Sequence, residues 1–97
     1  KSNFELNAVT FNDSWVGSTN KTTKKYDVVI ANIVADVLVM IAADLKKCLN
    51  KDGILIISGI LDKHINRVLS KFNDLEQVNL IHKNEWVSVI FKNNKEL

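Results

Sequence analysis

The chain has 97 residues, with 13 basic against 11 acidic side chains and a net charge of +2. This length allows one domain, and the charge is too balanced to indicate direct binding of nucleic acid. Hydrophobic residues make up 46% of the chain, and no apolar run approaches the roughly 20 residues that cross a bilayer, so we expect no membrane partner and a cytoplasmic location. The single cysteine, Cys48, excludes an internal disulfide and a cysteine-cluster metal site. We expect no metal ion.

The first quarter of the chain predicts little regular structure. We interpret Lys1–Ala8 as the last turns of a helix and Val9–Phe11 as a short β-strand that ends in a turn at Asn12–Ser14. The polar stretch 17–25 has no hydrophobic periodicity and is interpreted as a loop.

A strand that leads directly into a helix follows. Tyr26–Ile30 carries β-branched and aromatic side chains with almost no polar alternation, which indicates a central parallel strand covered on both faces by helices. Asn32 is left at the carboxyl end of this strand, the edge at which open α/β sheets bind ligands. Beyond it, apolar residues recur at intervals of three and four, the pattern of an amphipathic helix; they are Val34, Val37, Leu38, Ile41, Leu45, Cys48 and Leu49.

A second strand and helix repeat this order. Asn50–Gly53 is typical of a turn, in which Gly53 can take a positive φ, and Ile54–Ser58 is again a buried strand. Gly59 permits a tight turn or a close approach of the backbone. Asp62 is a candidate cap for the next helix, whose inner face would consist of Leu61, Ile65, Val68, Leu69 and Phe72.

The last quarter predicts an antiparallel hairpin. Gln77–His82 and Trp86–Phe91 are β-prone runs separated by a connection of hairpin length. Lys92–Leu97 is polar and is expected to fray. Trp86 is interpreted as a buried anchor of the sheet rather than a substrate-facing aromatic. Neither His64 nor His82 has an evident carboxylate partner, so both are interpreted as surface residues.

Several of these segments together resemble the carboxyl-terminal half of the PrmA family, the methyltransferases that act on ribosomal protein eleven of the large subunit. The resemblance covers nearly the whole chain, and Ala31–Asp36 followed by Ser58–Leu61 is its most specific part; the segments are Asn3–Ala8, Tyr26–Asp36, Ser58–Leu61 and Glu85–Val87. It implies an α/β fold, a partial Rossmann-like class I methyltransferase sheet that is mostly parallel and ends in a carboxyl-terminal antiparallel hairpin.

The same resemblance implies that the catalytic domain is incomplete in residues 1–97. The first two strands and the glycine-rich loop that holds S-adenosylmethionine would be missing, and Val9–Phe11 would be the third strand of the family's sheet. The chain would be a fragment of a larger protein or the product of a degenerate gene. We expect weak or no binding of S-adenosylmethionine, little or no activity in isolation, and self-association through the open sheet edge beside Tyr26–Ile30.

By resemblance, Asn32 is both the catalytic and a cofactor-binding residue, beside the transferred methyl group and the incoming amine. An amide oxygen can accept the hydrogens of a neutral amine without adding a competing nucleophile. Asn32 could instead, or in addition, cap the following helix. Asp13 matches the region that contacts the adenine, although an aspartate after a strand is also an ordinary turn residue. Asp36 is expected to favour the helix dipole.

The favoured function is therefore part of an S-adenosylmethionine-dependent protein lysine methyltransferase with a ribosomal protein as its substrate. Two alternatives stay open. The chain could be a non-catalytic binding or assembly module that retains half of the fold. It could also be part of a class I methyltransferase that acts on another protein, a small molecule or RNA.

Overall fold

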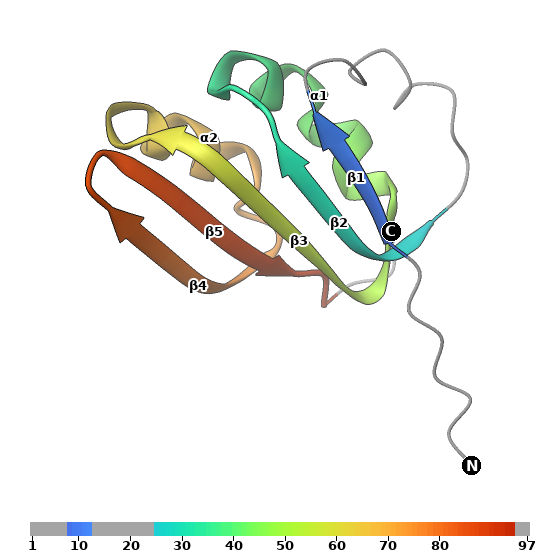
Figure 1. Ribbon diagram of the computed structural model, residues 1–97. Coiled ribbons are helices and arrows are strands. Elements are labelled where there is room, and N and C mark those ends of the chain that lie inside the picture. Colours follow the sequence, from blue (N-terminus) through green and yellow to red (C-terminus); the bar gives the residue numbers. More distant parts are fainter. Residues whose placement is uncertain (1–7, 13–24, 95–97) are drawn as a thin grey trace.

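The computed structural model describes residues 8–12 and 25–94, and of residues 8–12 only the backbone (Figure 1). Asp13, most of the predicted loop 17–25 and residues 1–7 of the predicted first helix lie outside the described residues. Ala8, which was assigned to that helix, instead begins a strand. The described strands form one sheet in the order β1-β2-β3-β5-β4; they are β1 (Ala8–Asn12), β2 (Tyr26–Asn32), β3 (Leu49–Leu61), β4 (Glu76–Lys83) and β5 (Trp86–Lys92).

The sheet is mixed. β1 pairs with β2 and β2 with β3 in parallel, whereas β5 pairs antiparallel with both β3 and β4. The predicted hairpin is therefore confirmed, but within the described residues parallel pairings do not predominate, because the hairpin adds as many antiparallel pairings as there are parallel ones. Asn32 pairs with Ser58, so β2 and β3 bring their carboxyl-terminal parts to the same edge.

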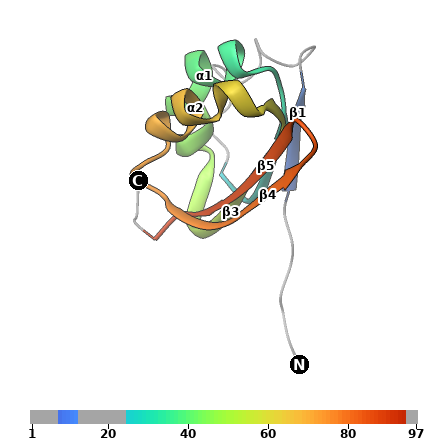
Figure 2. The same ribbon diagram turned by 90° about the vertical axis from the view of Figure 1, so that its left-hand side faces the viewer.

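Both described helices lie on one face of the sheet (Figure 2). They are α1 (Ala35–Lys47) and α2 (Ile65–Lys71), the latter preceded by the 3-10 turn η2 (Asp62–His64). Strand residues facing them are fully buried, among them Val29, Leu55 and Val89. Their neighbours on the opposite face are only half-buried; these are Val28, Ile30, Ile54, Ile56 and Ile90. The prediction that helices cover both faces is thus wrong for the described residues, although the aliphatic composition that suggested it is present on both faces.

The edge of β2 that was predicted to be open is occupied. β1 pairs along it from Ala8 opposite Val28 to Asn12 opposite Asn32. Unpaired backbone donors and acceptors of an edge are satisfied by an adjacent strand, and here the chain's own β1 supplies that strand. The expected site of self-association is therefore wrong.

The helical pattern predicted the packing of α1 well. Leu38, Ile41 and Leu45 are buried, and Cys48 and Leu49 follow them into the core. Val34 is the exception, because it precedes the first turn and is 52% exposed. The predicted inner face of α2 is confirmed in part: Val68 and Phe72 are fully buried, and Ile65 and Leu69 are partly buried against the core. Leu61, which was assigned to the same face, instead ends β3. None of the helices in residues 25–94 is long and apolar enough to cross a membrane.

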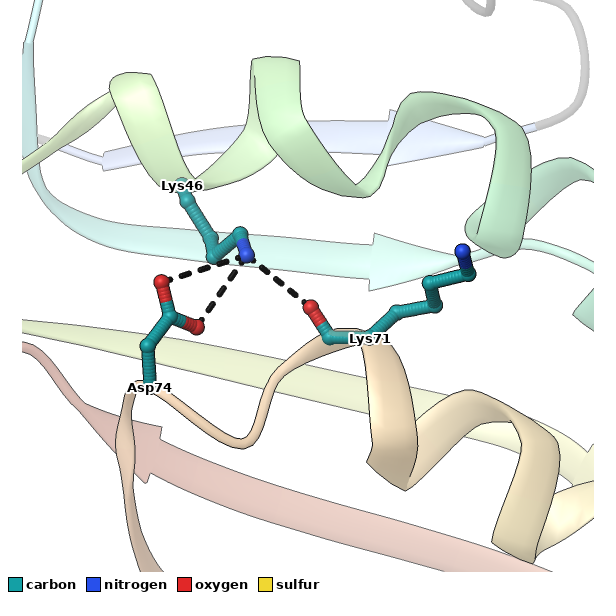
Figure 3. A network of polar contacts seen from close by, with 3 residues as sticks. All are labelled: Lys46, Lys71 and Asp74. Carbon is teal, nitrogen blue, oxygen red and sulfur yellow. Dashed lines mark hydrogen bonds and ion pairs between the residues drawn. The ribbon is translucent and has the colours of Figure 1, made fainter.

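The carboxyl-terminal ends of the two helices are tied together by one lysine (Figure 3). The ammonium group of Lys46 lies 3.1 Å from Oδ1 of Asp74 and donates to the carbonyl oxygen of Lys71 over 3.0 Å. It also lies 5.9 Å from the ring centroid of Phe72, which stacks on Phe91 of β5. These contacts hold α2 against α1 and over the hairpin.

The predicted turn at Asn50–Gly53 lies within β3. Asp52, with φ of 65°, takes the positive φ that was predicted for Gly53. Gly53 is needed for a different reason, because a Cβ there would lie 2.8 Å from the carbonyl oxygen of Asn50. The amide of Asn93 donates to the carbonyl of Gly53 over 2.9 Å, and Asn93 is fully buried. The prediction that Lys92–Leu97 frays is therefore wrong for Lys92 and Asn93. Residues 95–97 lie outside the described part of the chain.

Candidate functional site

Asn32 is the last residue of β2 and is exposed at the carboxyl edge of the sheet, as predicted. The interpretation of Asn32 as a helix cap is wrong, because α1 has Val34 as its N-cap and no side-chain hydrogen bond there. The first turn of α1 instead contains Asp36, whose charge suits the helix dipole as expected. The amide of Asn32 is thus not engaged in capping the start of α1.

Gly59, on the neighbouring strand, leaves room for the amide of Asn32. A register irregularity between Ile57 and Ile60 interrupts the pairing of β3 with β5, and Gly59 lies in it with φ of 79°. A Cβ on Gly59 would lie 2.7 Å from Oδ1 of Asn32. Only glycine therefore combines this left-handed backbone with space for the Asn32 side chain. The close approach predicted for Gly59 is confirmed, and the group that approaches is a side chain.

Asn32 opens into a hollow of about 510 Å³ that it shares with Ile33, Val34, Gly59 and Trp86. Hollows of this size are typical of small-molecule sites. The indole of Trp86 is 48% exposed, so its interpretation as a buried anchor is wrong. Val87, the next residue of β5, is 1% exposed and fills the core instead. Strand alternation explains the difference, because successive side chains point to opposite faces.

A second hollow of about 170 Å³ adjoins the first and shares Val34, Gly59 and Trp86 with it; the remaining lining residues are Ala35, Asp36, Leu61, His64 and Arg67. Oδ1 of Asp36 lies 2.7 Å from the guanidinium of Arg67, which links the start of α1 to α2. These opposite charges offset each other, so the lining retains no strong net charge. His64 is half-buried here rather than a simple surface residue.

The other histidine does have a carboxylate partner, contrary to expectation. Nε2 of His82 lies 3.4 Å from Oδ2 of Asp62, and both side chains are about half exposed. The N-cap positions of η2 and α2 are held by Leu61 and His64, so the predicted role of Asp62 as a cap is wrong. Within residues 25–94, His, Cys, Asp and Glu form no group of three that could hold a metal ion.

Cys48 behaves as the small buried hydrophobe that the sequence predicted. It is 3% exposed, and burial, with a smaller contribution from the carboxylate of Asp44, raises the pKa of its thiol. A thiol held protonated in this way is a poor nucleophile. It takes no part in the site.

Sequence reasoning missed one residue of this region, Arg67, and one contact, that of Gly59 with Asn32. Arg67 lies on the polar side of a short helix, where no pattern singles it out, and only the packing of α2 against α1 brings it to Asp36. The contact of Gly59 with Asn32 joins residues 27 positions apart in the chain. The position of Gly59 directly after an aliphatic strand indicated a close approach, but the sequence did not indicate that Asn32 is the residue that approaches.

Solved structures with the same arrangement are methyltransferases. Residues covering 78% of this chain superpose on 41% of a ribosomal protein L11 methylase from Lactobacillus delbrueckii subsp. bulgaricus, with a TM-score of 0.72 and 23% identity. The N-methyltransferase NodS from Bradyrhizobium japonicum, in complex with S-adenosyl-L-homocysteine, gives a TM-score of 0.58 at 14% identity over 77% of this chain and 50% of its own. The fold is that of the class I methyltransferases.

Sequence relatives narrow this class to one family. The family model described as "Ribosomal protein L11 methyltransferase (PrmA)" matches residues 1–94. A protein of that name from Campylobacter lari is 50% identical over 95% of this chain, and one from Nitratiruptor is 48% identical over 96%. The chain belongs to the PrmA family of ribosomal protein methyltransferases. It spans about a third of the length of these relatives, 33% in each case.

Proposed function

We propose that residues 1–97 form the carboxyl-terminal part of the catalytic domain of an S-adenosylmethionine-dependent protein lysine methyltransferase that acts on a ribosomal protein. The observation that carries this proposal is the exposed amide of Asn32, held beside Gly59 in an open hollow at the carboxyl edge of the sheet. The names of the relatives support the substrate class. A ribosomal substrate implies a cytoplasmic location.

The described residues suit part of a site for S-adenosylmethionine. The hollow of about 510 Å³ lies within the usual range for a cofactor-sized ligand. When bound, the cofactor supplies an electrophilic methyl group on a sulfonium. Asn32 would contribute binding and orientation, and we also propose that Asp13 contacts the adenine. The fit is partial, because the three glycines of the chain form no glycine-rich loop.

The reaction itself requires positioning rather than an acid and a base. The cofactor would supply the methyl group to the lone pair of a neutral acceptor amine, with its sulfur as the leaving group that keeps the electrons of the carbon–sulfur bond, and the methylated amine would release its proton to water. The amide oxygen of Asn32 can accept a hydrogen bond from that amine and hold its lone pair on the methyl axis. Gly59 leaves room for this oxygen, which a larger residue at that position would displace.

The test is methyl transfer to the ribosomal protein by a chain of the relatives' length that contains these residues. Asn32→Ala should lower kcat on the order of 100-fold, the loss expected when a reacting group is misplaced. Asn66→Ala, which removes an exposed amide on α2, should have no effect. Equal kcat for the Asn32→Ala variant and the parent would refute the role of Asn32, and no transfer by the parent would refute the proposed activity.

The isolated 97 residues should bind the cofactor weakly or not at all. The half-buried aliphatic face opposite the helices is left without a cover in the described residues, and an uncovered apolar face of this kind suits packing against the remaining two thirds of a relative's chain. Calorimetric titration with S-adenosylmethionine should therefore show no submicromolar binding. Such binding would mean that the cofactor determinants lie within these residues.

A further inference from the structure

The first part of β3 forms a bulge against the end of β5. The last pair of the two strands is Ile54 with Lys92. Beyond this pair, the carbonyl of Asn93 accepts a hydrogen bond from the amide of Asp52 over 2.6 Å, and the amide of Asn93 donates to the carbonyl of Gly53 over 2.9 Å. Two residues of one strand opposite one residue of its neighbour form a β-bulge, whose first residue is often a left-handed glycine. Here that residue is Asp52, with φ of 65°.

Asp52 and Gly53 are also a chemically reactive pair. The side chain of an aspartate can react with the next backbone nitrogen, and glycine has no side chain that shields this nitrogen. Asp52 is the only aspartate or asparagine of the chain that a glycine follows. Packing requires this glycine, because a Cβ on Gly53 would lie 2.8 Å from the carbonyl oxygen of Asn50. The Asp52 side chain is 64% exposed, and its contact with Lys92, at 4.0 Å in solvent, holds it only weakly.

We propose that Asp52 is a modification site, at which the chain isomerises spontaneously to isoaspartate at a rate that Asn93 controls. The backbone nitrogen of Gly53 forms a bond to Cγ of the protonated Asp52 carboxyl group and loses its proton, while one carboxyl oxygen leaves as water. The product is a cyclic succinimide. Water then adds to the ring carbonyl that came from the main chain and breaks its bond to nitrogen. The chain now runs through the former side chain and carries the α-carboxylate as a branch. Water is the only co-reactant, and the proposal is independent of methyl transfer.

The closed bulge opposes this reaction. Attack brings the nitrogen of Gly53 within bonding distance of Cγ of Asp52, which requires rotation about the single bonds of Asp52. The two hydrogen bonds of Asn93 lie on either side of its Cα–C bond and restrain that rotation. Asn93 is itself fully buried, and its side-chain amide donates to the carbonyl of Asn50 over 3.2 Å. Because Asn93 lies just past the end of β5, the bulge can open locally without global unfolding. Asn93 thus sets the fraction of time for which the bulge is open.

Isomerisation would also weaken the fold. It inserts one methylene between the amide of Asp52 and the carbonyl of Gly53, so that Asn93 can no longer bond to both. A buried backbone group that loses its partner is destabilising. The isomerised fraction of the protein should therefore unfold at a lower temperature than the fresh protein.

The test incubates a folded chain of the relatives' length in water enriched in heavy oxygen and locates isoaspartate and the incorporated oxygen by fragmentation mass spectrometry. Both should accumulate at Asp52, more slowly than in a synthetic peptide of residues 50–54. Asn93→Ala should raise the rate on the order of fivefold, the factor that the loss of one neutral hydrogen bond gives. Asn94→Ala is the matched control, because it removes an exposed amide that is bonded to Glu76 instead, and it should leave the rate unchanged. Asp52→Glu should abolish the product, because the longer side chain closes a less favourable ring.

Two results would overturn the proposal. If the parent forms no isoaspartate while the peptide is converted, Asp52 is not a modification site. If Asn93→Ala and the parent react at the same rate, Asn93 does not control the reaction. Circular dichroism checks that Asn93→Ala is folded. Should it unfold, hydrogen exchange of the Asp52 amide in the parent measures the opening directly, and an amide that exchanges only through global unfolding would exclude local opening of the bulge.

Discussion

Oδ1 of Asn32 lies 2.7 Å from the point that a Cβ on Gly59 would occupy. The two residues come from neighbouring parallel strands, and Gly59 reaches this position through the irregularity in β3 and a φ of 79°. The side chain that would orient the acceptor therefore depends on a backbone conformation in the adjacent strand. This dependence makes Gly59 testable without touching any polar group.

Gly59→Ala should destabilise the protein by about 1–2 kcal/mol, because an L-residue is strained at this φ. The new methyl group should also push the amide of Asn32 aside and lower kcat further than the stability loss explains. Methyl transfer is measured well below the unfolding temperature of the variant.

Gly53→Ala is the matched control for that substitution. Its methyl group would also meet an oxygen, the carbonyl of Asn50 at 2.8 Å, but at the opposite end of β3 from the site. This variant should lose stability and keep kcat. If both variants keep kcat, Gly59 does not position Asn32.

Lys46→Met should lower the free energy of unfolding by about 1 kcal/mol, the scale of a partly shielded ion pair with an additional charged hydrogen bond. Methionine keeps the apolar stem over Phe72 but loses the contacts with Asp74 and with the carbonyl of Lys71 (Figure 3). Urea denaturation at low and high salt measures the change, which should shrink only slightly with salt because the Lys46 side chain is 19% exposed.

Asp36→Asn provides the comparison for this ion pair. The distance from Asp36 to Arg67 is shorter, 2.7 Å, but the two side chains are 79% and 46% exposed. We expect a loss below about 0.5 kcal/mol that disappears at high salt. A larger loss than that of Lys46→Met would show that distance outweighs exposure here.

The stability should fall at alkaline pH through Cys48. Burial raises the pKa of this thiol in the folded protein, so between the unfolded and folded values the folded state binds more protons. This contribution is fully present below about pH 8.5, the usual value of a free cysteine, and is lost as the pH rises through the raised folded value. The stability advantage of the parent over Cys48→Ala should therefore shrink between pH 7.5 and pH 10. An advantage that grows with pH would contradict the direction of the shift.

We still propose that the chain self-associates, but through the outer edge of β1 rather than through β2. β1 pairs on one side only within the described sheet, and an edge strand can pair with a second chain. On the other edge, Oδ1 of Asn79 accepts a hydrogen bond from the backbone amide of Leu80 over 2.8 Å. This amide of β4 is therefore not free to pair with a second chain. Light scattering of the isolated chain at about 100 μM, where even weak association is populated, should show dimers or larger species. A monomer at that concentration would refute the proposal.

From Tyr26 onwards, the sequence by itself determined the order and type of the elements, the buried face of α1 and the rim position of Asn32. These depend on local periodicity, which is carried by the side chains of each segment alone. The family could also be recognised from the sequence alone, because the segment around Asn32 followed by the segment around Gly59 is a specific motif. The sequence did not predict the length of β3, because the turn-forming residues at its start are held in the strand by a hydrogen bond from Asn93 to Gly53, 40 positions apart in the chain.

Tertiary structure alone decided the surroundings of Asn32. Strand alternation, set by the register of β5 against β3 at Val87 opposite Ile60, turns Trp86 out into the hollow. The packing of α2 on α1 brings Arg67 to Asp36, and β1 covers the edge that local reasoning left open. Each of these relationships joins residues distant in sequence, so no local pattern records it. The segment Tyr26–Asn32 carries the strand and its asparagine in its own composition, but the wall that faces the asparagine comes from β3 and β5.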